Sequence, residues 1–233
     1  MLILAFETSA KAGSVALLDG NRLLGEYYQN TAMTQSTTVM VMAESLIATC
    51  GHTPGDIQAV AVANGPGSFT GVRIGVAAAK GFAFGADIPC CGVSTLEAMA
   101  ENLGVRDGYV VCVMDARRAQ VYTAVFRACA GQLTRVTPDR AISLEQLGQE
   151  IKNIKESVFL VGDGSFLCYN TFKDTLPSLI LPPEHRMMPR AAGVGLCAYR
   201  ALCAGESADA GTLKPNYLRL SQAERERLAR EQK

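Results

Sequence analysis

Residues 64–75, with the sequence NGPGSFTGVRIG, join an apolar run at 59–63 to a second apolar run that continues to about residue 84. The Gly-Pro-Gly step turns the chain, and Ser68 or Thr70 is suited to cap a helix that follows it. Gly71 and Gly75, with the alanines at 77–79, leave one face of this helix almost bare of side chains. The stretch therefore predicts a strand, a tight loop and a helix that another backbone can approach closely.

The loop before this helix has two interpretations. Glycine-rich loops at helix starts either cradle an anion with their amides or simply turn the chain. A small-residue turn at 7–14 lies after the first predicted strand and is the other candidate for an anion or nucleotide contact. The candidate contacts are Glu7, Thr8, Ser9, Gly65, Gly67 and Ser68.

The bare helix face also has two interpretations, because it either packs on its own sheet or forms an interface. The predicted helix at 37–50 is similar, since Met40 and Val41 leave its second side apolar. Methionines at 33, 40 and 42 suit a surface that accepts more than one partner. The candidate interface residues are Gln35, Val39, Met42, Phe69, Thr70, Gly71, Val72, Arg73, Ile74, Gly75, Ala78 and Ala79.

Length and composition limit the class of protein. The chain has 233 residues, of which 48% are hydrophobic, enough for one large core or two modest ones. Its 22 basic and 22 acidic residues create no global field for nucleic acid or an acidic membrane. Arg73 and Lys80 interrupt the longest apolar run, so we expect no membrane span. Eight scattered cysteines and a strand-like start without a signal peptide predict reduced thiols and a cytoplasmic protein.

The order of predicted elements repeats along the chain. Strands at 2–7, 14–18 and 22–28 precede a helix at 37–50, a strand at 59–63, a helix at 69–84, a strand near 91–93 and a helix at 95–103. Strands at 109–114, 121–127 and 133–137 then precede a helix capped by Ser143, a strand at 158–161 and a helix at 165–173. A last helix covers 191–204. Two β-β-β-α-β-α units predict a duplicated α/β fold with mixed central sheets.

The repeat predicts three parts of the chain. Residues 1–104 form an N-terminal unit with the association helices, and residues 105–213 form a C-terminal unit. Residues 214–233 form an extended and then strongly charged tail. The tail is either a solvated, partly frayed helix or an arm that orders against a partner.

Several motifs together resemble one family. They are ILAFETS at 3–9, the glycine-rich stretch at 65–75, STLEA at 94–98, MDARR-x-x-VY at 114–122 and YLRLSQAER at 217–225. In this order and nearly end to end, they resemble the TsaB family of bacterial threonylcarbamoyladenosine-biosynthesis proteins, once called glycoprotease-like. The resemblance implies a duplicated actin/Hsp70-like ATPase fold of the ribonuclease H type, in agreement with the repeat.

The resemblance also implies a function. TsaB proteins are non-catalytic partners of TsaD, the related subunit that transfers threonylcarbamoyl to the tRNA adenosine beside the anticodon, and the ATPase TsaE joins them. A member of the family is expected to form a homodimer alone and a heterodimer with TsaD through the helical surface. It is expected to meet tRNA only through the complex, to hold no metal or cofactor of its own, and to border ATP or ADP at the complex interface.

The residues agree that this chain lacks peptidase machinery. His52 and His185 are its two histidines, and neither belongs to an H-x-x-x-H or H-E-x-x-H pair. Gln35 stands where family members often have His. There is no G-x-S-x-G elbow, because Ser68 lies in Pro66-Gly67-Ser68-Phe69. We therefore expect neither a metallopeptidase nor a serine peptidase.

An actin-like or sugar-kinase-like ATPase with its own nucleotide turnover is the alternative. Actin-like ATPases hold hydrated magnesium with an Asp after the first strand, and this chain has the longer Glu7, with Lys11 in the turn. Magnesium demands tight geometry, so this pair disfavours hydrolysis. The loose pattern Gly193-x-Gly195 follows Pro189-Arg190 instead of a strand, which indicates helix packing.

The segment Asp115-Ala116-Arg117-Arg118 follows a predicted buried strand. It is either a hairpin with a salt-bridged tip or, as the resemblance allows, a set of arginines facing the cleft or the tRNA-bearing complex. The zero net charge and the lack of a basic stripe with aromatics argue against tRNA binding by this chain alone.

Overall fold

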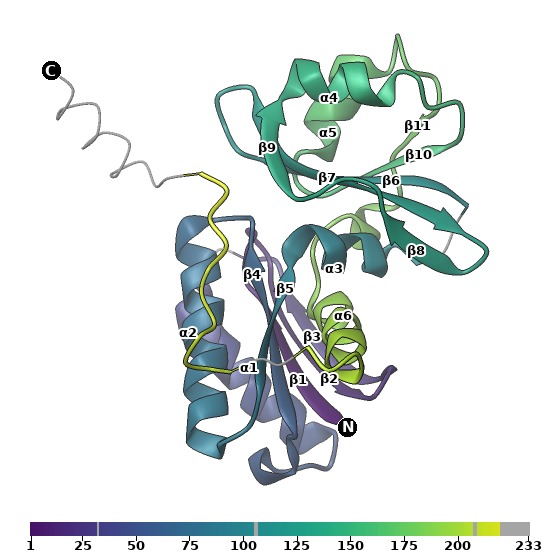
Figure 1. Ribbon diagram of the computed structural model, residues 1–233. Coiled ribbons are helices and arrows are strands. Elements are labelled where there is room, and N and C mark those ends of the chain that lie inside the picture. The colour runs from purple at the N-terminus through teal and green to yellow at the C-terminus, as the bar shows by residue number, and fades with distance from the viewer. Residues whose placement is uncertain (32, 105–106, 207–208, 220–233) are drawn as a thin grey trace, which may run out of the picture.

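The computed structural model describes residues 1–31, 33–104, 107–206 and 209–219, which form two lobes, each built on a mixed sheet (Figure 1). The first sheet has the order β3-β2-β1-β4-β5. Its strands are β1 (Leu2–Glu7), β2 (Gly13–Asp19), β3 (Arg22–Gln29), β4 (Ala59–Gly65) and β5 (Cys90–Ser94). The β1–β2 and β2–β3 pairs are antiparallel, whereas β1–β4 and β4–β5 are parallel. The predicted α/β class with mixed sheets is confirmed.

The second sheet repeats this plan with the order β11-β10-β6-β7-β8, and β9 pairs with β7 beside β8. Its strands are β6 (Gly108–Asp115), β7 (Gln120–Cys129), β8 (Gln132–Arg135), β9 (Arg140–Ser143), β10 (Val158–Val161) and β11 (Leu179–Ile180). Strands β9 and β11 are absent from the prediction. They have four and two residues, too few to show a periodic pattern.

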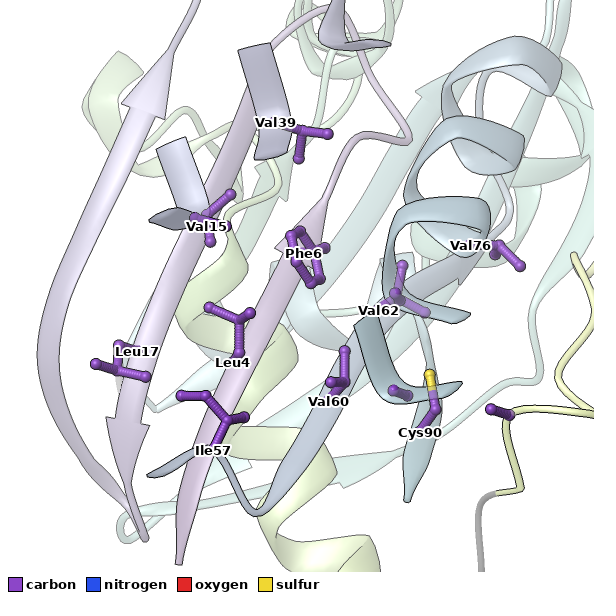
Figure 2. Packing of buried hydrophobic residues seen from close by; sticks show 14 of the residues in the cluster. Leu4, Phe6, Val15, Leu17, Val39, Ile57, Val60, Val62, Val76 and Cys90 are labelled. Carbon is purple, nitrogen blue, oxygen red and sulfur yellow. The ribbon is translucent and has the colours of Figure 1, made fainter. Parts of the chain in front are cut away.

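Helices cover both faces of the first sheet because β1 and β2 alternate apolar side chains between them. Leu4, Phe6 and Val15 pack with α1 (Gln35–Thr49) and α2 (Phe69–Ala86), as Figure 2 shows. Ile3 and Leu18 point to the opposite face and pack with α6 (Ala191–Cys203). Full burial of one such side chain contributes about 1.5–3 kcal/mol, so this two-faced core holds the lobe together.

The lobes meet through α3 (Thr95–Asn102), which contacts α6 and packs on one face of the second sheet. The opposite face of that sheet is covered by α4 (Leu144–Ile151) and α5 (Ser165–Phe172). Ser68, Ser94 and Ser143 each accept a hydrogen bond from a backbone amide at the start of α2, α3 and α4. The sequence therefore places the helix starts correctly, and Ser68 is the cap of α2.

Helix α6 does not follow the predicted division of the chain. The division assigns 191–204 to the C-terminal unit, but α6 packs on the first sheet. Small residues allow this close packing, because a Cβ at Gly193 would collide with the Ala98 carbonyl of α3 and one at Gly195 with Leu18 of β2. The Gly-x-Gly pattern is therefore a helix-packing feature. The predicted bounds at 104 and 213 stay predictions.

The small-residue stripe of α2 faces its own sheet. A Cβ at Gly71 would collide with the Thr8 carbonyl oxygen, and one at Gly75 with the Thr8 hydroxyl and Val62. Ala79 on the same stripe is fully buried. The expectation that this stripe offers a flat free surface is therefore wrong, because the turn after β1 occupies the space that the glycines leave.

The described part of the tail is extended and follows α2 (Figure 1). Lys80 of α2 donates to the carbonyls of Gly211 and Leu213, and Leu213 is buried in the core beneath. The Asn216 amide donates to the Asn64 carbonyl at 2.6 Å. The tail therefore orders against its own chain over 209–219, and its charged part from 220 lies outside the described residues.

Replacing Gly71 by alanine tests the close approach of α2. The added methyl group meets backbone, which cannot move aside as a side chain can. We expect Gly71→Ala to lower the free energy of unfolding by about 1–3 kcal/mol, measured by urea denaturation.

Gly81→Ala is the matched control in the same helix. Nothing lies within 4 Å of its added Cβ, and the position is exposed. Alanine favours helix over glycine by up to about 1 kcal/mol, so this variant is expected to be as stable as wild type or more so. Equal effects at the two positions would contradict the packing described for Gly71.

Candidate functional site

A cleft of about 990 Å³ lies between the two lobes. Its lower wall comes from the turn after β1, the Gly-Pro-Gly loop and the first residues of α2. Its upper wall comes from the hairpin between β6 and β7 and from Asp163 after β10, and residues 216–219 of the tail border its mouth. The structure thus gathers motifs that lie far apart in the sequence.

Glu7 lies fully buried below this cleft at the end of β1. Its Oε1 accepts a hydrogen bond from the Ser9 amide at 2.6 Å, whereas Oε2 has no partner among the described residues. Burial raises the pKa of the Glu7 carboxyl to about 7, against the opposing effect of Ser9, whose side chain and amide both lower it. Ser9 lines the cleft, and its buried hydroxyl also lacks a partner in the described part of the chain.

The candidate anion contacts bind the start of α2 through hydrogen bonds. The Thr8 hydroxyl donates to the Gly71 carbonyl at 2.7 Å, and the Ser68 amide donates to the Ser9 carbonyl at 2.6 Å. The Ser68 hydroxyl accepts from the Gly71 amide at 3.3 Å. The structure therefore brings together residues 7–9 and 65–68, and much of their hydrogen bonding is used to hold the helix. An anion at these residues stays a prediction.

The β6–β7 hairpin has an uncommon backbone. Arg117, Arg118 and Ala119 all lie in the left-handed region, with φ of 61°, 57° and 55°. Asp115 accepts a hydrogen bond from the Arg117 amide at 2.7 Å, and Asp163 accepts one from the Asp115 amide at 3.0 Å. Backbone amides thus occupy these carboxylates, and the described residues show no ion pair at the tip. The predicted salt-bridged tip is wrong.

The tail joins both walls of the cleft. Tyr217 stacks on Phe69 of α2 with ring centroids 4.7 Å apart, and its hydroxyl accepts from Arg73 Nε at 2.7 Å. The Arg73 guanidinium carbon lies 3.8 Å from the centroid of Phe69. Two residues on, Arg219 donates to the Ala116 carbonyl of the β6–β7 hairpin at 2.7 Å. The tail is therefore a connection between α2 and the second lobe.

Several large apolar side chains of α1 and α2 are exposed or half-buried. Met40 and Val41 of α1 are 42% and 63% exposed, and Phe84 of α2 is 84% exposed. The half-buried Met42 and Ile74 of the same two helices also pack against the core of the first lobe, and Val41 and Met42 line a groove beside Tyr28 of β3. We call these five helix residues the outer face of α1 and α2. Large exposed apolar side chains on neighbouring helices are typical of an interaction surface.

The candidate interface residues divide according to their burial. Val39, Gly71, Val72, Gly75 and Ala79 are buried in the core of the first lobe. Thr70 and Arg73 are exposed, and Met42, Phe69, Ile74 and Ala78 are intermediate. Gln35 has a local role, because its Nε2 donates to the carbonyls of Ala10 and Lys11. The buried members offer no free surface, so any partner contact must come from the others.

Sequence reasoning misses Asp163 and the role of Phe84. Asp163 follows β10 in the sequence Gly-Asp-Gly, and burial raises its pKa. This pattern resembles any turn after a strand, so the sequence gives no signal that it faces Asp115. Phe84 belongs to an apolar run, and nothing in the sequence marks it as exposed.

The remaining chemistry of the described residues is limited. No group of three or more potential metal ligands lies together in the described ranges. None of the eight cysteines forms a disulfide in the structure. Within the described part of the chain, no helix is long and apolar enough to cross a membrane.

Comparisons with known proteins agree on one family. A family model described as "TsaD: tRNA N6-adenosine threonylcarbamoyltransferase" matches residues 29–227. The chain is 35% identical over 225 residues to the tRNA threonylcarbamoyladenosine biosynthesis protein TsaB of Bacillus subtilis, and the match covers 96% of each chain.

Solved structures show the same fold. YeaZ from Pseudomonas aeruginosa superposes with a TM-score of 0.77 at 25% identity, covering 93% of this chain and 99% of that one. Component A of the (R)-2-hydroxyglutaryl-CoA dehydratase of Acidaminococcus fermentans shares the fold with a TM-score of 0.50 at 10% identity, covering 87% of this chain and 99% of that one. The duplicated actin/Hsp70-like fold is therefore confirmed.

The buried carboxyl of Glu7 predicts a distinctive pH dependence of stability. Its pKa is about 7 in the folded chain against an ordinary value of 4.5, so the folded state holds this proton over a range where the unfolded state has lost it. The free energy of unfolding therefore falls as pH rises from 4.5 to 7, by on the order of 3 kcal/mol from this group.

Glu7→Gln removes this dependence, because the amide cannot ionise. We expect the variant to gain stability over wild type between about pH 5 and about pH 8, measured by urea denaturation. Glu44→Gln, at an exposed position of α1, is the control and should parallel wild type. Parallel curves for Glu7→Gln as well would show that Glu7 does not keep its proton in the folded chain.

Proposed function

The chain belongs to the TsaB family of tRNA threonylcarbamoyladenosine biosynthesis proteins, and on this premise we propose that it is a non-catalytic subunit of the tRNA-modifying complex. It forms a homodimer alone and pairs with a TsaD-like catalytic subunit, which it supports during threonylcarbamoyl transfer to the adenosine beside the anticodon. A TsaE-like ATPase joins the pair. The observation that carries the proposal is the exposed apolar outer face of α1 and α2.

The surroundings of Glu7 support a non-catalytic role. A magnesium-dependent ATPase of this fold needs a carboxylate that holds hydrated magnesium at the floor of the cleft, and magnesium keeps several waters when bound. The Glu7 side chain is fully buried, one of its oxygens is bonded to the Ser9 amide, and burial raises its pKa. These residues do not fit a magnesium–nucleotide site, which disfavours the alternative of an ATPase with its own turnover.

The outer face supports both kinds of pairing. Exposed apolar side chains on two adjacent helices can bury one another across a two-fold axis, which gives a homodimer. The family model that matches this chain describes a TsaD protein. A catalytic subunit with the same arrangement of helices can replace one copy, and the methionines at 40 and 42 can repack for either partner. Nucleotide at the junction of such a complex stays a prediction.

Val41→Glu tests the position of the partner face. Val41 is exposed in the single chain, so a carboxylate there leaves the fold unaffected, but burying that charge in an interface is costly. We expect the dissociation constants of homodimer and heterodimer to rise at least about tenfold, measured by size-exclusion chromatography with light scattering and by titration of the TsaD-like subunit.

Leu167→Glu on α5 of the second lobe is the matched control, since Leu167 is also an exposed large apolar residue. This variant should associate like wild type. If Val41→Glu associates normally while Leu167→Glu does not, the partner face lies on the second lobe and the proposal places it wrongly.

A further inference from the structure

Cations without acidic partners gather at the mouth of the interlobe cleft. Lys11, Arg117 and Arg219 line the cleft, and Arg73 lies against its lining residue Phe69. Among the described residues, none of these four forms an ion pair. In contrast, the following arginines elsewhere are each paired with a carboxylate: Arg127, Arg135, Arg140, Arg190 and Arg200. The cleft is thus lined by three cations from separate segments, Lys11, Arg117 and Arg219, together with the two carboxylates of Asp115 and Asp163.

Two of these cations are held in position with donors to spare. Arg73 Nε donates a hydrogen bond to the Tyr217 hydroxyl, and one terminal nitrogen of Arg219 donates to the Ala116 carbonyl. A guanidinium has five N–H groups, so each retains donors for a ligand. Arg117 and the neighbouring Arg118 belong to the left-handed hairpin tip. Such strain is common at functional sites, and here Arg117 lines the cleft while Arg118 is the next, exposed residue of the hairpin.

The acidic groups in the cleft compensate this charge only in part. Asp115 accepts a hydrogen bond from the Arg117 amide, and Asp163 accepts one from the Asp115 amide. Burial raises the pKa of Asp163. Helix α2 begins at Phe69 in the same wall, and its dipole adds positive potential there.

The form of this mouth favours an extended polyanion over a small molecule. Its cations come from four separate segments: the turn after β1, helix α2, the β6–β7 hairpin and the tail. Beside them, the Tyr217 ring of the Phe69–Tyr217 stack is 41% exposed, and a base can stack on it. In this fold, binding of a free nucleotide requires magnesium, and the buried Glu7 side chain is not suited to hold that ion.

We propose that Lys11, Arg117, Arg118 and Arg219, with the Phe69–Tyr217 stack, form a contact surface for the RNA backbone. The surface binds phosphates of the tRNA that the catalytic subunit holds, and it adds affinity only within the complex. This inference rests on the proposed function, because the chain alone has no net charge to attract RNA.

The test uses the full chain in complex with the TsaD-like subunit of its source organism. The probe is unmodified tRNA with a fluorescent label, titrated at several salt concentrations. The variants are Arg117→Glu with Arg118→Glu, and separately Lys11→Glu. The control is Lys152→Glu with Lys173→Glu, which makes the same charge change at the exposed C-terminal ends of α4 and α5, away from the cleft.

We expect the Arg117/Arg118 variant to weaken tRNA binding by about tenfold or more. The slope of log K against log salt should become shallower by about 0.7–0.9 for each phosphate that the variant no longer neutralises. Lys11→Glu should weaken binding in the same direction, and the control should stay close to wild type. Light scattering, run before the titrations, should show a normal heterodimer for every variant.

The outcomes separate this inference from the proposed function. If the heterodimer forms but both cleft variants bind tRNA with unchanged affinity and salt slope, the RNA surface is wrong and the scaffold role stands. Equal weakening by the control would show a general charge effect and would also overturn it. If the wild-type chain forms no heterodimer, the proposed function fails and this inference fails with it. Calorimetry with ATP alone should show no binding that depends on Arg117, and such binding would identify a nucleotide site instead.

Discussion

The docking of helix α2 onto the turn after β1 is the contact on which the other features of this molecule depend. Gly71 and Gly75 lack side chains where Thr8 lies, and the Thr8 hydroxyl and the Ser9 carbonyl bond to the first turn of the helix. At Gly71 the helix backbone meets the backbone of Thr8, and at Gly75 it meets the Thr8 side chain, so the helix is held closely. The contact places the start of α2 in the cleft. The side of the helix away from the sheet then faces solvent, and the tail runs along the helix.

The two surfaces that we propose follow from this position and lie on different parts of the same helix. The outer face of α1 and α2 offers apolar side chains such as Val41 and Phe84 to a protein partner. The first turn of α2 borders the cleft with its unpaired cations. The tail lies between them, because Tyr217 stacks on Phe69 and Arg219 reaches the second lobe. This arrangement suits the scaffold role that we propose, with helices for the partner and a separate surface for the substrate.

The sequence predicts the elements better than their surroundings. Alternating or periodic apolar residues and serine caps locate most strands and helices, since these signals are local. They do not show which apolar face of α2 meets the sheet, because both faces of that helix are small or apolar. The place of α6 on the first sheet and the proximity of Asp163 to Asp115 depend on chain segments that return from far along the sequence. Burial of Glu7 is likewise invisible in the sequence, although its identity already raises the question of magnesium.

Hydrogen exchange of this chain, alone and mixed with the TsaD-like subunit, tests the account most directly. A partner on the outer face of α1 and α2 excludes solvent from it, so amide exchange should slow in residues 36–42 and 73–84. It should not change in α5, which has exposed apolar residues of its own. Slowing confined to α5, or no change in either helix of the outer face, would contradict the claim that this chain is a scaffold that pairs through these helices.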